Sequence, residues 1–181
     1  MTTTEPTTLP LAPGRWALDP AHSAVHFTIR HLGVSKVRGR FTRFTADVVI
    51  GETLATTSVE AVIEVSSVDT GNADRDAHVL APDMVDLAAR PTLTFRSNAI
   101  TGAGEAWELH GDLTIGEVTR PVTLDVELGG LQEFPGGPRH AGFEATTQIR
   151  RQDFGLIPAV PSAMLGDVIK VELDLQLLEP A

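Results

Sequence analysis

The chain has no cysteine among its 181 residues. Disulfide bonds, thiolate nucleophiles and cysteine-ligated metal centres are therefore excluded. Basic residues are also scarce, because 14 Lys and Arg stand against 24 Asp and Glu, for a formal net charge of −10. Nucleic acids and anionic membranes attract basic surfaces, so this balance argues against nucleic-acid binding and against an anionic membrane partner.

Long apolar segments are missing as well. No stretch of the sequence approaches the roughly 20 apolar residues that a membrane-spanning helix needs, so no membrane insertion is expected. The first residues, MTTTEPTTLPLAPG, have neither the basic region nor the apolar run of a signal peptide. The sequence therefore predicts a soluble protein, cytoplasmic as written, with a disordered or loosely docked tail over residues 1–14.

The chain does have apolar residues that alternate with period two. Val25, Phe27, Ile29 and His31 fall on one face of a predicted strand, and polar side chains alternate with them. His31 is the anomaly, because a titratable ring ends an otherwise apolar face. It is interpreted either as the polar end of a ligand site or as a hydrogen-bonded core histidine.

Similar segments recur along the chain and predict one all-β domain over residues 15–181. With the strand that begins near Arg15, they make about eight strands, the others covering residues 40–50, 58–69, 92–100, 106–115, 121–128, 142–150 and 167–178. Short connections favour antiparallel pairing, in either an up-and-down barrel or a sandwich. Phe41 and Phe44 have opposite parity, so a β-bulge is predicted between them. A short helix over residues 75–81 forms an insertion after the third strand.

Catalytic and metal-binding patterns are weak. His22 and His26 are four residues apart, which on a strand separates them by roughly 13 Å. Ser23 cannot use His22 as a base, because neighbours on a strand point to opposite faces. Arg151 and Asp153 are interpreted as a structural ion pair. No catalytic residue, no metal site and no cofactor are therefore predicted.

A series of short motifs runs in order from Trp16 to Glu179. It comprises W-x-L-D-x-x-H-S-x-V-x-F over 16–27, H-L-G over 31–33, G-x-F over 39–41, S-V-x-T over 67–70, R-D-x-H-V over 75–79, P-x-L-x-F over 91–95, G-x-L-T-I over 111–115, V-T-R-P-V over 118–122 and R-x-D-F-G over 151–155. Each motif is weak alone, but in this order they resemble the YceI-like lipid-binding proteins.

The resemblance implies an extended eight-stranded antiparallel barrel of lipocalin type, often dimeric. It implies a long apolar cavity for an isoprenoid or a related amphiphilic chain, and binding, storage or transport without turnover, so an enzyme is not expected. Members of the family are often exported, which this sequence as written does not indicate. A small apolar ligand and a homodimer partner are the expected interactions.

Two positions depart from the family pattern. Met84 stands where the family usually has an aromatic residue, and its flexible thioether is expected to reshape one end of the cavity. Gly116 comes one residue earlier than the family glycine, and Glu117 takes that place. If the turn needs a positive φ there, Glu117 is strained or the register has shifted.

Strand parity and the resemblance together give a set of candidate ligand-binding residues. The predicted lining is Phe27, Ile29, Phe41, Phe44, Ile63, Phe95, Leu113, Ile115, Leu124 and Phe143, with Met84 and Phe154 near the ends. His31, with His22 and Arg38, is expected to meet a polar head group. The alternatives are a lipid-directed enzyme that uses a cavity histidine, and a stress-related interaction module with a packed, ligand-free barrel.

Overall fold

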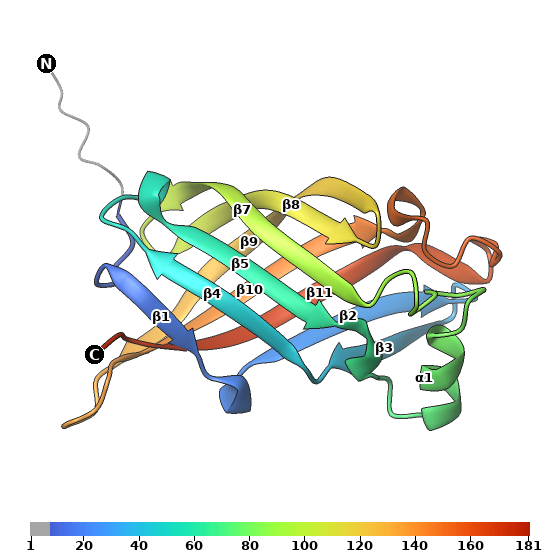
Figure 1. The fold of residues 1–181 in the computed structure, drawn as a ribbon, viewed down its shortest axis with the longest axis horizontal. Coiled ribbons are helices and arrows are strands. Elements are labelled where there is room, and N and C mark those ends of the chain that lie inside the picture. The colour runs from blue at the N-terminus through green and yellow to red at the C-terminus, as the bar shows by residue number, and fades with distance from the viewer. Residues whose placement is uncertain (1–7) are drawn as a thin grey trace, which may run out of the picture.

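The computed structural model describes residues 8–181, so the first seven residues of the predicted tail lie outside it. Figure 1 shows strands wound around a long axis, with one α-helix at one end. The elements are β1 (Gly14–Leu18), η1 (Pro20–His22), β2 (Ala24–His31), β3 (Ser35–Phe41), β4 (Phe44–Ile50), η2 (Leu54–Thr56), β5 (Ser58–Glu64), η3 (Val65–Ser67), β6 (Val68–Asp69), α1 (Ala73–Val79), β7 (Thr92–Ala103), β8 (Ala106–Ile115), β9 (Val118–Gln132), β10 (His140–Arg150), η4 (Arg151–Phe154) and β11 (Leu165–Leu178).

The strands form a closed eight-stranded antiparallel barrel, as predicted. Its order is β1-β4-β5-β7-β8-β9-β10-β11, with β1 pairing again with β11. Three strands are each bent into two pieces, so that β1 continues as β2, β3 as β4 and β5 as β6. The strand predicted over 40–50 also begins earlier, because β3 includes residues 35–39. The three pieces β2, β3 and β6 extend the sheet beyond β11 at one end.

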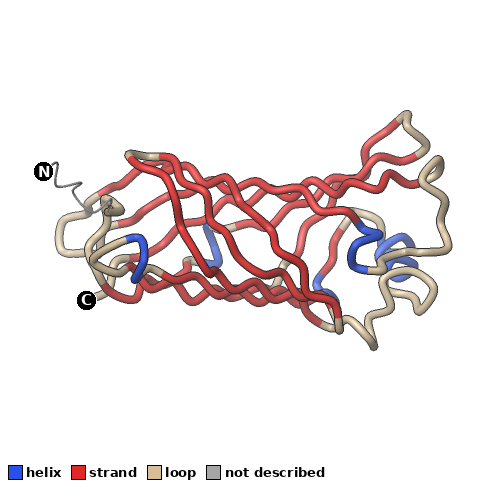
Figure 2. The backbone as a smooth tube through the Cα atoms, turned by 90° about the horizontal axis from the view of Figure 1, so that it is seen from above, coloured by secondary structure: helices blue, strands red, loops and turns tan. Residues whose placement is uncertain are grey.

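The barrel closes by different means at its two ends. At the end that holds both termini of the described chain, β1 meets β11 through only two residue pairs, Ala17 with Leu178 and Leu18 with Leu177. At the other end β6 pairs with Arg40 and Phe41 of β3, and within residues 8–181 the rest of β3 has no strand on that side. In Figure 2, α1 and the loops close to it occupy this second end.

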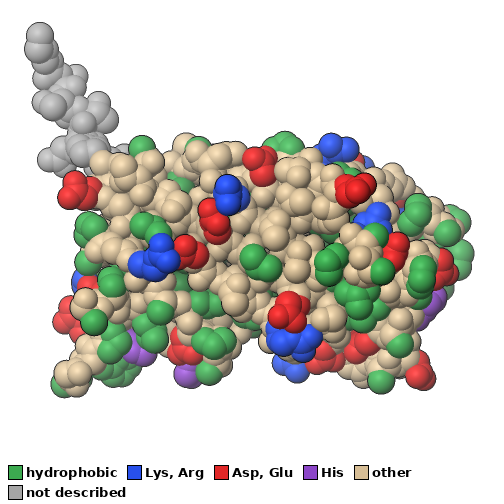
Figure 3. All heavy atoms as spheres, in the orientation of Figure 1, with side chains coloured by type: hydrophobic (Ala, Val, Ile, Leu, Met, Phe, Trp, Pro, Cys, Tyr) green, Lys and Arg blue, Asp and Glu red, His purple; other side chains and the backbone are tan. Residues whose placement is uncertain are grey.

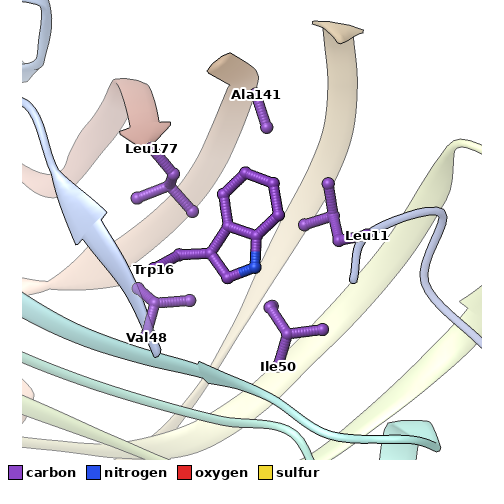
Figure 4. Close-up of a cluster of buried hydrophobic side chains, with 6 residues drawn as sticks. All are labelled: Leu11, Trp16, Val48, Ile50, Ala141 and Leu177. Atoms are coloured by element: carbon purple, nitrogen blue, oxygen red, sulfur yellow. The ribbon is translucent and has the colours of Figure 1, made fainter. Parts of the chain in front are cut away.

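Two apolar clusters mark the two ends of the barrel interior. Trp16, with 1% of its surface exposed, centres the first cluster, and its Nε1 donates a hydrogen bond to the Ala12 carbonyl over 2.9 Å. Figure 4 shows the members of this cluster, Leu11, Trp16, Val48, Ile50, Ala141 and Leu177. The second cluster consists of Ile115, Ile149, Phe154, Leu156 and Ile157. Because β10 contributes Ala141 to the first and Ile149 to the second, the space between them runs along the barrel axis.

A buried arginine holds the segment that covers the second cluster. Arg151 is 1% exposed, and its guanidinium donates to the carbonyls of Ile157 over 2.6 Å and Val160 over 2.8 Å. Its Nη2 also lies 3.2 Å from a carboxylate oxygen of Asp167. The predicted pairing with Asp153 is therefore wrong, because a buried cation needs several acceptors at once and the returning loop supplies them.

The two local irregularities predicted from the sequence have clear outcomes. Phe41 and Phe44 end β3 and begin β4, and the break between them lets both side chains line one interior. Gly116 takes φ +62° in the two-residue turn between β8 and β9, whereas Glu117 is not among the residues with positive φ. Glu117 is thus not strained, and the glycine occupies the first turn position, where a type II′ hairpin needs it.

Candidate functional site

An internal cavity of about 220 Å³ lies between the two clusters. Every strand of the described chain except β6 contributes a side chain to its wall. The lining is apolar apart from His26 and three threonines, Thr45, Thr57 and Thr147. Within residues 8–181, no Lys, Arg, Asp or Glu takes part in it.

Most of the predicted lining residues meet in this cavity. Those that border it are Phe27, Phe41, Phe44, Ile63, Phe95, Leu113, Leu124 and Phe143. The others lie elsewhere: Ile115 and Phe154 are buried in the second cluster with Met84 packed against it, and Ile29 is buried on β2 outside the lining. Strand parity decides whether a side chain points inward, but it carries no information about depth along the barrel axis.

The three side chains predicted at the polar end do not border the cavity. His31 is exposed at the end of β2, and Arg38 is exposed on β3. His22 is exposed too, and its Nδ1 lies 2.8 Å from a carboxylate oxygen of Asp19. His31 has inward parity, but β2 runs past the end of the cavity, so its ring meets solvent. His26 is among the residues that border the cavity, although its cross-strand partner Glu172 lies on the outer face, as alternation predicts for this position.

Two aromatic side chains lie against glycines of the neighbouring strand. Phe27 pairs with Gly39, where a Cβ atom would come within 2.3 Å of the ring. A Cβ on Gly111 would come within 2.5 Å of the Phe95 ring. Glycine therefore lets each ring pack directly over the backbone. The ring in turn compensates for the stability that a glycine takes from a strand. The G-x-F and G-x-L-T-I motifs carry these glycines, so the sequence does hold a signal for this part of the wall.

Trp107 is the one indole that borders the cavity. It is 4% exposed, and its ring centroid lies 6.4 Å from that of Phe143. Its Nε1 is buried and has no hydrogen-bond partner within the described part of the chain. Buried donors are normally paired, so this unpaired N–H is an exception that calls for an explanation.

The ionisable groups with perturbed pKa values lie on the outside of the barrel. A hydrogen bond from His22 is the largest cause of the lowered pKa of Asp19, and one from Arg139 lowers the pKa of Glu179. The Gly71 amide, followed by Arg40, lowers the pKa of Asp69. None of these carboxylates borders the cavity, and His26 is the single titratable residue that does so among residues 8–181.

Comparison with known proteins places the chain among proteins of this architecture. Protein YceI of Escherichia coli is 38% identical over 136 residues, which cover 75% of this chain and 71% of the relative. The crystal structure of the Campylobacter jejuni YceI protein superposes with a TM-score of 0.76 at 28% identity, over 84% of this chain and 91% of that one.

A third protein has the same fold at low identity. It is a polyisoprenoid binding domain from Saccharophagus degradans, with a TM-score of 0.65 and 14% identity, over 93% of this chain and 100% of that one. The model of the YceI-like domain family matches residues 16–177, which include nearly all of the barrel. The chain thus belongs to the YceI-like domain family.

Proposed function

We propose that the barrel binds one elongated apolar molecule, an isoprenoid or a similar lipid chain, in its internal cavity. The observation that carries the proposal is the cavity itself, whose wall is apolar on all sides and holds no charged residue from the described chain. An apolar cavity with few polar groups is the usual form of a small-ligand site.

The size of the cavity sets the scale of the ligand. An apolar cavity of about 150 Å³ holds one benzene molecule, so by the same measure 220 Å³ holds roughly nine carbon atoms. Leaving such a volume empty costs on the order of 5 kcal/mol, at about 24 cal/mol per Å³. A bound chain that fills the space therefore stabilises the folded protein, and a longer chain must displace side chains of the end clusters.

The composition of the cavity wall also limits the charge that the head group of the ligand can carry. A phosphate inside the cavity would lack a cation, because no Lys or Arg of residues 8–181 borders it, and burying an unpaired charge is strongly unfavourable. We therefore favour a neutral ligand, such as a prenol or a quinone-like molecule with an oxygen acceptor. The free Nε1 of Trp107 is the donor that such an oxygen would use.

Binding and transport fit this site better than turnover does. A lipid-directed enzyme needs two titratable groups within hydrogen-bond reach of each other, and His26 is alone among the lining residues of the described chain. A packed interaction module would have a filled interior, whereas the barrel encloses a cavity. The name of the Saccharophagus degradans domain agrees with the proposed ligand class, and at its low identity that likeness supports the fold.

A prenol series tests the proposal. Delipidated protein is titrated with geraniol, farnesol and geranylgeraniol, and binding is followed by thermal denaturation and by tryptophan fluorescence, because Trp107 borders the cavity. We expect a rise in melting temperature with every prenol that fits, and weaker binding of farnesyl diphosphate than of farnesol. Organic extraction of protein from its native host, followed by mass spectrometry, should release a long-chain lipid. If no prenol shifts the melting temperature and extraction yields no lipid, the proposal is refuted.

A further inference from the structure

One hairpin of this acidic chain carries basic residues and no acidic one. Residues 20–46 carry five of the 14 Lys and Arg and none of the 24 Asp and Glu. The hairpin made by β2 and β3 holds most of them, and it projects at the end of the barrel that carries α1 (Figure 1). The net charge of −10, from which the sequence argued against anionic membranes, thus conceals a strongly uneven distribution.

Three of these basic side chains have no carboxylate to neutralise them. Arg40 pairs with Asp69 over 3.0 Å and Arg43 with Glu64 over 2.6 Å. Arg30, Lys36 and Arg38 are exposed and have no carboxylate oxygen within 4.0 Å among residues 8–181. Arg38 has a weaker, longer-range effect on Glu172, since it contributes, after Lys170 and His26, to the lowered pKa of that carboxyl.

Two of the three unpaired cations face each other directly. Arg30 and Lys36 are cross-strand partners in the β2–β3 ladder. Like charges at directly opposite positions destabilise a sheet. A fold that needed only a stable hairpin would not place them there, so this pair points to an anionic surface outside the molecule.

The end of the hairpin carries exposed apolar side chains. Leu32, Val34 and Met164, which we call the apolar tip, are 53%, 86% and 51% exposed. They form one surface, because the Leu32 amide donates a 2.8 Å hydrogen bond to the Met164 carbonyl and so ties the hairpin turn to the loop before β11. Figure 3 shows hydrophobic side chains gathered at this end of the molecule.

The backbone at the tip is strained in order to present a leucine. Leu32 has φ +53°, in the left-handed region that β-carbon-bearing residues other than Asn and Asp rarely adopt. Asn or Gly would suit this conformation better and would also avoid an exposed apolar side chain. The sequence therefore accepts both backbone strain and solvent exposure at the same residue.

We propose that the β2–β3 hairpin docks the protein on the surface of an anionic phospholipid bilayer. The apolar tip enters the interfacial region while Arg30, Lys36 and Arg38 lie at the level of the phosphates. A protein partner is less well matched, because three exposed apolar side chains beside unpaired cations do not make the broad apolar centre of a stable protein interface. The contact is peripheral, and no helix in residues 8–181 is long and apolar enough to cross a membrane.

Vesicle flotation with the full chain tests the proposal. Each basic residue near an anionic bilayer strengthens partitioning about fivefold, so the triple variant Arg30→Gln, Lys36→Gln, Arg38→Gln should bind about 100-fold more weakly. The vesicles are phosphatidylcholine alone or phosphatidylcholine with phosphatidylglycerol, without isoprenoid, so the result is independent of cargo binding. The matched control is Arg15→Gln, Arg96→Gln, Arg120→Gln, which removes the same charge from exposed positions on other strands.

Two single variants separate the apolar contribution from charge. Val34→Ser should weaken binding to the anionic vesicles severalfold, whereas Val62→Ser, exposed on β5, should leave it unchanged. Leu32→Asn should weaken binding and raise the melting temperature, because asparagine relieves the left-handed strain. A merely structural role for Leu32 would instead lower the melting temperature.

The outcomes decide the matter clearly. Salt-sensitive binding to the anionic vesicles, lost in the triple variant and kept in its control, supports the proposal. Equal binding to both vesicle types, or equal binding by the two triple variants, overturns it. Salt-sensitive self-association that the triple variant abolishes, with no vesicle binding, overturns it in favour of a second copy of the chain as the partner.

Discussion

Filling the cavity from the protein side should raise stability and lower ligand affinity at the same time. Ala61 on β5 is suited to this test, because it borders the cavity and stays half-buried inside the barrel. Its partner on β4 is Ala46, which borders the cavity as well, so two small side chains face the empty space together. The substitution Ala61→Leu places three further carbon atoms in that space.

The expected magnitudes follow from burial. Three carbon groups at about 0.8 kcal/mol each give about 2.4 kcal/mol, and fixing the leucine side chain takes back about 0.5–1 kcal/mol. The ligand-free protein should thus gain about 1.5–2 kcal/mol, which is about 3–8 °C in melting temperature for a domain of this size. A ligand that loses contact with the same volume should bind roughly 50-fold more weakly.

Calorimetry on delipidated protein and a farnesol titration measure the two effects. Ala17→Leu is the matched control, since Ala17 is exposed on β1 and the same carbon atoms there should change neither quantity appreciably. If Ala61→Leu lowers the melting temperature, as overpacking by about 1–3 kcal/mol does, the space is not empty and the reasoning fails. If stability rises while affinity is unchanged, the ligand binds elsewhere.

Three further predictions concern the rest of the barrel. Arg151→Lys should destabilise the protein by about 3 kcal/mol in urea denaturation, because lysine cannot satisfy the carbonyls of Ile157 and Val160 together with Asp167. An unchanged denaturation midpoint would show that the loop does not depend on the guanidinium. Trp107→Phe should lower stability only by the packing that the smaller ring gives up, because the lost Nε1–H has no partner within residues 8–181. It should weaken farnesol binding more than binding of the matching hydrocarbon, and equal losses would argue against a hydrogen bond to the ligand. Arg139 lowers the folded-state pKa of Glu179, so the contribution of this carboxylate to stability is complete above the ordinary pKa of 4.5 and disappears as the pH falls through the lowered value. Glu179→Gln should therefore flatten the loss of stability on acidification. Identical acid-unfolding curves for the two proteins would contradict this.

The sequence predicts the architecture well, because alternation is a local signal that repeats in every strand. The eight strands, the helical insertion and the shared interior of Phe41 and Phe44 all follow from it. The bends that split three strands are less visible, since they depend on how distant strands close the barrel. The two-residue strand β6 is too short to show a pattern of its own.

The candidate site is predicted less completely, and the misplacements share one cause. Ile115, Phe154 and His31 all have inward parity or an end position, yet two lie in a packed cluster and one meets solvent. Period two distinguishes inside from outside, whereas the length of the cavity along the axis depends on which side chains meet across the barrel. The partners of Arg151 are likewise unreadable from its neighbours, because they come from a loop that returns from up to 16 residues away.

The seam between β1 and β11 also governs when the interior comes into existence. It joins Ala17 and Leu18 to Leu177 and Leu178, residues from opposite ends of the chain, through two pairs alone. Contacts so distant in sequence are the slowest to form, since the entropy of closing the longest loop must be overcome first. During synthesis the N-terminal strand has to wait, unpaired along this edge, until the last strand has been made. The cavity therefore forms only when β11 has paired with β1. Because so few residue pairs join these two strands, we expect the barrel wall to open most easily between them.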